Sequence, residues 1–178
     1  MKKHIIVMLA LVLNGCGEAT PTAPANNEAS APTKTEQTPK WYEDDLSTPV
    51  ENVGFDDPKS IMASAKLKPV KTEKDKDPRG ETETRYTFSN NSLNAQLEHS
   101  RNFINISWYQ ASDSPTALPQ SNESLKQAYL LARAMMGEQG KEAVRHLSKG
   151  GTYKGDMVAG VKLNGNCVSS MCLLTITR

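Results

Sequence analysis

Two cysteines near the carboxyl terminus, Cys167 and Cys172, are five positions apart and could form a disulfide. In one extended strand their Cα atoms would be roughly 17 Å apart, whereas a disulfide allows about 4.4–6.8 Å. The bond therefore requires the chain to turn between them. The usual redox spacing, Cys-x-x-Cys, is absent from the sequence. We expect a structural disulfide; the alternative is two buried thiols or a redox pair.

Few side chains are available for catalysis. The chain has three histidines, one of them in the amino-terminal segment. His99 falls in an expected turn and His146 on a helix flank beside Arg145, positions more typical of solvated or helix-end histidines than of a catalytic base. The motifs of serine hydrolases, zinc proteases, phosphate-binding loops and dinucleotide sites are absent. We predict no catalytic residue, no metal site and no cofactor.

Large apolar side chains could instead anchor a partner. Trp41 and Tyr42 stand at the edge of the expected domain, Trp108 ends an apolar stretch, and Met135 and Met136 could line an adaptable groove. The alternatives are a lid over the core for the aromatic pair and core packing for the methionines. These five residues are the candidate partner-binding residues.

The charge balance disfavours nucleic acid as the partner. The 178 residues include 21 Lys and Arg against 20 Asp and Glu, a net charge of +1. A chain so close to neutral provides no strong field to concentrate nucleic acid or anionic lipid. Its length suits one small domain with accessory segments.

The amino terminus has the pattern of a signal peptide. A cationic start, Met1-Lys2-Lys3-His4, precedes nine apolar residues from Ile5 to Leu13. Crossing a bilayer takes roughly 20 apolar residues, so this run is too short for a transmembrane helix. We therefore assign residues 1–15 to a signal peptide.

The end of this run, Leu13-Asn14-Gly15-Cys16, resembles the processing site of bacterial lipoproteins. The resemblance implies cleavage before Cys16 and acylation of that cysteine. Gly17, directly after the cysteine, is similar to the residues that outer-membrane lipoproteins carry at this position. Several acyl chains on one residue give a stable anchor, since each buried methylene adds about 0.8 kcal/mol. The alternative is a secreted protein cleaved elsewhere. We expect a lipid anchor in the outer membrane, facing the periplasm.

Two further segments precede the main domain. Residues 16–40 form an expected disordered tether, because Gly17 to Lys40 holds no large apolar side chain and is rich in Ala, Thr and Pro. Residues 41–80 form an expected extended collar with one short helix, which begins at Asp57-Pro58. The alternating charges from Lys71 to Gly80 indicate a solvated loop, and the alternative is a docking surface.

Residues 81–178 show the pattern of an α+β domain. Three runs alternate with period two and predict a meander of three strands: "TRYTF", "LNAQLE" and "FINISWY". A helix is expected from Asn122 or Ser124, with a break at Gly137 or Gly140 and a second helical stretch over 141–149. The last 22 residues predict a hairpin that turns either at Asn164-Gly165 or at residues 168–171.

Together these features predict an α+β fold, with an antiparallel sheet of about five strands packed on one helix after a disordered tether. The expected function is that of a membrane-anchored envelope lipoprotein with a small, non-catalytic periplasmic domain for binding or assembly. Its partners would be membrane lipid, through acylated Cys16, and an envelope protein or cell-wall component. The alternative is a small cell-wall hydrolase or an enzyme inhibitor.

Overall fold

The computed structural model describes residues 50–110 and 114–177, which belong to one compact unit, Gln37–Arg178. Its helices are α2 (Pro58–Ser64), α3 (Leu118–Met136) and α4 (Glu138–Ser148). Its strands are β1 (Lys71–Lys76), β2 (Thr82–Thr87), β3 (Gln96–His99), β4 (Phe103–Tyr109), β5 (Tyr153–Val158), β6 (Val161–Val168) and β7 (Met171–Thr177).

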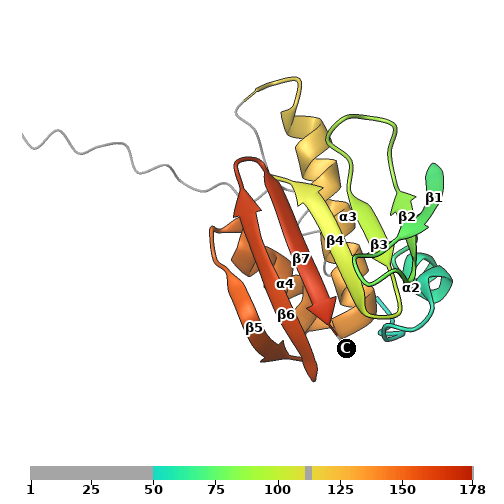
Figure 1. Ribbon diagram of the computed structural model, residues 1–178. Coiled ribbons are helices and arrows are strands. Elements are labelled where there is room, and N and C mark those ends of the chain that lie inside the picture. Colours follow the sequence, from blue (N-terminus) through green and yellow to red (C-terminus); the bar gives the residue numbers. More distant parts are fainter. Residues whose placement is uncertain (1–49, 111–113, 178) are drawn as a thin grey trace, which may run out of the picture. The chain divides into compact units, whose positions relative to one another are not determined.

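All described strands join one antiparallel sheet in the order β1-β2-β3-β4-β7-β6-β5. The helices α3 and α4 lie behind this sheet in Figure 1 and cover one of its faces. The predicted α+β class is confirmed, as is the meander, here β2-β3-β4. The prediction of about five strands packed on one helix is wrong, because the sheet has seven strands and both α3 and α4 pack on it.

The first additional strand is β1. We predicted a solvated loop from Lys71 to Gly80, but residues 71–76 pair in register with β2. All six residues of β1 are exposed. The period-two signal is missing because an edge strand with two wet faces needs no apolar side, and its charges discourage pairing with another chain.

The second additional strand is β5, at the opposite edge. It joins β6 through a turn in which Ala159 and Gly160 have positive φ, so the carboxyl-terminal segment forms three strands and not two. A bulge between Lys154 and Asp156 shifts the register and breaks the alternation that sequence reading depends on. Asn164-Gly165 lies inside β6, and the β6–β7 turn follows Val168.

The observed helix boundaries agree with some of the local sequence signals and differ from others. Asp57 caps α2 as predicted, and its carboxylate accepts bonds from the amides of Lys59 (3.0 Å) and Ser60 (3.1 Å). The break at Gly137 is also confirmed. In contrast, α3 begins at Leu118 and not near Ser124, whose hydroxyl accepts a bond from the Tyr109 amide (3.0 Å) and so ties α3 to the end of β4.

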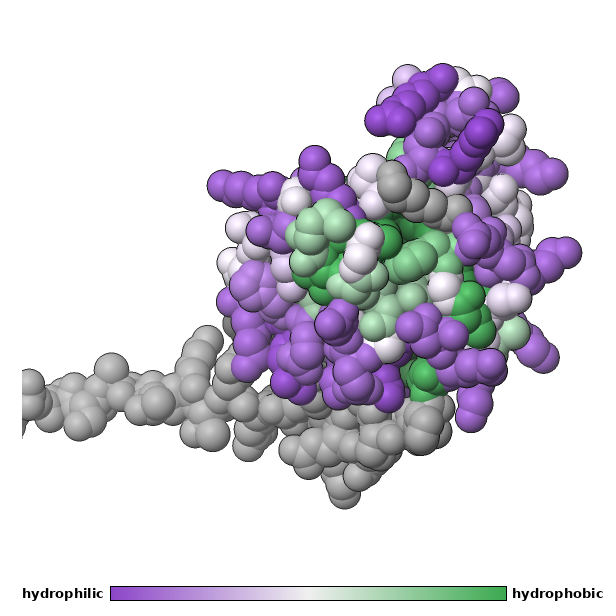
Figure 2. All heavy atoms as spheres, turned by 90° about the horizontal axis from the view of Figure 1, so that it is seen from below, coloured by the Kyte–Doolittle hydropathy of each residue, from purple (hydrophilic) through white to green (hydrophobic). Residues whose placement is uncertain are grey.

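The core lies between the sheet and the helices. Alternate residues of β4 and β7 are fully buried on this side, as are residues of α3 and α4. Figure 2 views the end of the domain at which β7 ends, where apolar residues gather in the middle and hydrophilic residues surround them. The largest completely buried side chains include Trp108, Ile104, Ile106, Leu131, Leu147, Leu163, Leu174 and Ile176.

Candidate interaction surface

The two faces of the sheet differ in what covers them. Along β4, Ile104, Ile106 and Trp108 are fully buried under the helices, while the four residues that alternate with them are only partly buried. Paired residues of adjacent strands share a face, so the register extends this division across the sheet. We call the face opposite the helices the open face. Its central strands present Phe103, Asn105, Ser107, Tyr109, Met171, Leu173, Thr175 and Thr177.

A continuous row of polar residues crosses the open face. Asn105 is its centre: its amide nitrogen donates to Glu98 Oε2 (2.9 Å), and its amide oxygen accepts from the Thr175 hydroxyl (2.8 Å). Arg85 Nε donates to the other Glu98 oxygen (2.7 Å). These bonds link β2, β3, β4 and β7 across the face. In strand order the row, which we call the polar row, consists of Glu73, Arg85, Glu98, Asn105, Thr175, Asn164 and Lys154.

Next to this row, Glu83 is nearly buried on the open face. One of its oxygens lies 3.6 Å from Arg85 Nη2. Burial and the Glu98 carboxylate raise the pKa of Glu83, with Arg85 opposing them. The bond to Glu98 raises the pKa of Arg85, which stays cationic. This end of the open face therefore holds fixed charges on β1, β2 and β3.

The other end of the open face is apolar at its rim. Five large apolar side chains are exposed among the described residues. Three of them belong to this face: Met157 (69%), Val168 (64%) and Met171 (48%). Met171 pairs with both Val168 and Tyr109, so these three residues form one patch, whereas Met157 pairs with Lys162 at the other end of β6. Exposed apolar side chains grouped on one face are typical of an interaction surface.

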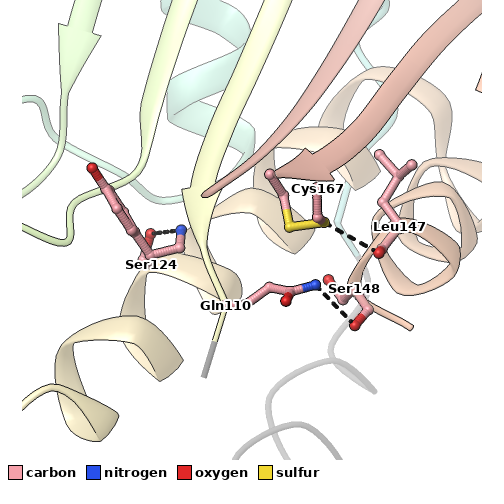
Figure 3. Close-up of a disulfide and its surroundings, with 7 residues drawn as sticks. Gln110, Ser124, Leu147, Ser148 and Cys167 are labelled. Carbon is pink, nitrogen blue, oxygen red and sulfur yellow. Dashed lines mark hydrogen bonds between the residues drawn. A yellow bond between two sulfur atoms is a disulfide. The ribbon is translucent and has the colours of Figure 1, made fainter. Parts of the chain in front are cut away.

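The patch stands on a rigid hairpin. The disulfide between Cys167 and Cys172 closes the β6–β7 turn and joins two residues that pair directly across the strands. Cys167 Sγ lies 3.2 Å from the Leu147 carbonyl oxygen, beside the bond from Gln110 Nε2 to the Ser148 carbonyl (Figure 3). The Gln110 amide donates to the Ser170 carbonyl in the turn (2.7 Å). The patch is therefore presented by an ordered backbone, which lowers the entropy cost of binding.

The predicted disulfide is confirmed: the chain turns between the two cysteines, as the spacing required. The other predicted residues that the structure describes are core residues. Trp108 is 0% exposed, Met135 1% and Met136 4%, all between the sheet and the helices. They stabilise the domain that presents the open face and are not part of that face.

Three predicted residues, Cys16, Trp41 and Tyr42, lie outside the described residues, as do the signal peptide and the tether. Their roles stay predictions. Sequence reading did not find Met157, Val168 or Met171. A signal existed for Met171, which alternates with the buried Cys172, Leu174 and Ile176, but alternation alone does not show which face a helix covers.

The two described histidines make structural contacts. His99 Nε2 lies within hydrogen-bonding distance of the Phe55 carbonyl oxygen (2.9 Å) and joins the β3 end to the segment before α2. His146 Nε2 lies 3.4 Å from the Thr152 carbonyl oxygen, and its ring packs against Tyr153. Both rings thus connect segments of the fold.

Comparisons with known proteins gave no match: neither a family model, nor a curated protein, nor a solved structure resembles this chain. None of the helices in the described part has the length and apolar character needed to cross a bilayer. Residues 50–110 and 114–177 also hold no group of three or more side chains arranged to bind a metal ion.

Proposed function

We propose that this chain is a lipoprotein of the bacterial cell envelope, anchored through acylated Cys16, and that its folded domain is a non-catalytic binding or assembly domain facing the periplasm. The observation that carries the binding role is the open face, where exposed apolar side chains stand beside a fixed polar row. A rigid sheet with one uncovered, partly apolar face is suited to holding another macromolecule.

The disulfide supports the proposed compartment. Bonds of this kind form and persist in oxidising surroundings such as the periplasm and are rare in the cytosol. The Cys167–Cys172 bond closes a surface hairpin and has no redox motif around it. Together with the resemblance of residues 13–16 to a lipoprotein processing site, it favours an envelope location.

The anchor is tested by intact-mass analysis of protein purified from membranes. We expect the mass of acyl groups on the peptide that begins at Cys16, and a gain of two hydrogen atoms on reduction. Cys16→Ser should move the protein out of the membrane fraction. The matched control is the double variant Cys167→Ala, Cys172→Ala, which should stay there. An unmodified Cys16 in wild-type protein contradicts the anchor.

The binding role is tested by photo-crosslinking in intact cells. A photoreactive residue replaces Met157 or Val168 on the open face, and replaces Val70 or Leu118, which are exposed elsewhere (51% and 40%), as the control. We expect a covalent adduct of one defined mass from the open-face positions and not from the controls. Equal labelling at all four positions, or none, argues against a binding surface there.

A further inference from the structure

The charges of the open face are divided between its two sides. On β1, β2 and β3 the register places four acids and two bases on this face, so acids are in excess by two. Arg85 is held between Glu83 and Glu98, and Lys71 pairs with Glu73 (2.9 Å). The residues of this acidic side are Lys71, Glu73, Asp75, Glu83, Arg85 and Glu98.

The opposite side of the open face is basic. Lys154 on β5 and Lys162 on β6 lie on this face by register, Lys154 at the end of the polar row and Lys162 beside Met157. The Lys162 side chain crosses over Gly155, because a Cβ atom on that glycine would lie 2.7 Å from Lys162 Cε. The basic side thus carries two surplus cations and the acidic side two surplus anions. The strands β4 and β7 lie between the two sides.

This arrangement is complementary to itself. Two copies packed face to face, related by a two-fold axis along the central strands, place β1 and β2 of each copy against β5 and β6 of the other. Glu73 then faces Lys154, and Glu83 faces Lys162, while Phe103 and Tyr109 of the central strand lie near the axis. Closed two-fold dimers use one self-complementary patch in this way, and sheets in such sandwiches pack about 10 Å apart.

The size of the face suits a dimer. Seven strands about 4.8 Å apart and on average about six residues long cover roughly 29 by 21 Å. Two such faces bury on the order of 1,200 Å² in total, at the lower end of the range of about 1,200–2,000 Å² for specific interfaces. Burial of Met157, Val168 and Met171 would remove most of the exposed large apolar side chains of the described domain.

We propose that the open face is the interface of a symmetric homodimer, whose partner is a second copy of this chain. This inference rests on the binding role proposed above and names its partner; it does not depend on the lipid anchor. The dimer is a two-layer β-sandwich flanked on both outer sides by helices.

The experiment measures dimerisation of residues 16–178 carrying Cys16→Ser, a soluble chain that keeps every core residue, since the core lies between Ile61 and Ile176. Sedimentation velocity from about 1 to about 200 µM should show a monomer–dimer equilibrium. One variant reverses the charges of the basic side (Lys154→Glu, Lys162→Glu). Another reverses two acids of the acidic side (Glu73→Lys, Asp75→Lys). Each alone should associate at least tenfold more weakly than wild type.

Mixing the two variants gives the decisive result. One half of the interface then keeps its wild-type charges, and in the other half the reversed Lys154 position faces the reversed Glu73 position, so the mixture should form a heterodimer that is tighter than either variant's homodimer. The matched control, Lys66→Glu with Lys68→Glu, makes the same change of charge beside α2 and should dimerise like wild type. The apolar counterpart is Val168→Asp, expected to weaken association, against Leu118→Asp, expected to leave it unchanged.

The outcomes separate this inference from the proposed function. A chain that stays monomeric over the whole concentration range, or charge variants that dimerise normally, overturns the homodimer. If the open-face crosslinks in cells then lead to a different protein or to the chain's own amino-terminal segment, the binding role stands and the second copy does not. Loss of both the dimer and the crosslinks overturns both proposals.

Discussion

At the scale of single residues, the open face contains one carboxylate that is costly to ionise. Burial and the Glu98 charge raise the pKa of Glu83 above its ordinary value of 4.5. The folded state therefore binds this proton more tightly than the unfolded state does. By linkage, the stability associated with Glu83 is greatest below about pH 4.5 and is lost as the pH rises through the raised pKa.

This cost predicts the behaviour of Glu83→Gln, which keeps the shape of the side chain and removes its ionisation. At about pH 7 the variant should be more stable to urea than wild type, and the difference should shrink as the pH falls through the raised pKa and vanish well below about pH 4.5, where Glu83 is protonated in both states. Unfolding is measured at concentrations where the chain is monomeric. Glu73→Gln, on the exposed strand β1, is the matched control and should show little change. A variant less stable at pH 7 contradicts the argument.

At the scale of elements, one glycine sets how closely α3 and α4 pack. A Cβ atom on Gly140 would overlap the Ala132 carbonyl oxygen and lie 3.1 Å from Met136 Cβ. The sequence suggested that Gly140 weakens or breaks the helix, but it is a buried residue inside α4. Because Gly140 has no side chain, α3 and α4 can approach each other closely at this point. An added methyl group would prevent that approach.

Gly140→Ala is therefore destabilising although alanine favours helices. The expected loss is at least about 2 kcal/mol in the free energy of unfolding, as for other overpacked positions. Its neighbour Gln139 is exposed, and Gln139→Ala should change stability by less than about 0.5 kcal/mol. Chemical denaturation of both variants measures the difference. Equal stability would mean that the helices separate freely at this point.

The β6–β7 hairpin gives a second prediction at this scale. Removing the disulfide with Cys167→Ala and Cys172→Ala should lower the free energy of unfolding by about 2 kcal/mol, the chain-entropy value for so small a ring. Because the same bond holds the turn that carries Val168 and Met171, dimerisation should weaken as well. Denaturation and sedimentation of the double variant test the two effects separately. Ser169→Ala, in the same turn, is the control.

What the sequence could predict depends on how each element is buried. The strand β4 alternates between buried and partly exposed residues, and its period of two is plain in "FINISWY". The edge strands β1 and β5 carry no such signal, since β1 is charged throughout and β5 contains a bulge. The open face could not be predicted, because it depends on which side of the sheet the distant helices α3 and α4 cover.

At the scale of the whole molecule, the net charge is close to neutral, although acids and lysines lie on opposite sides of the open face. A chain with a net charge of +1 has little tendency to repel its own copy. The separation of Glu73, Asp75 and Glu83 from Lys154 and Lys162 then decides how two copies are oriented. Attraction between the sides acts across an interface that is open to ions at its edges.

This predicts a specific response of the dimer to salt. Because the screening length falls from about 10 Å at 0.1 M to about 3 Å at 1 M, raising the sodium chloride concentration over this range should weaken dimerisation several-fold. The variant Lys154→Glu, Lys162→Glu should respond in the opposite sense, since salt screens the repulsion that the substitutions introduce. Sedimentation equilibrium at both salt concentrations measures the two constants. A wild-type dimer that salt strengthens would be held by apolar contact alone, and the charge separation would then have no part in orienting the copies.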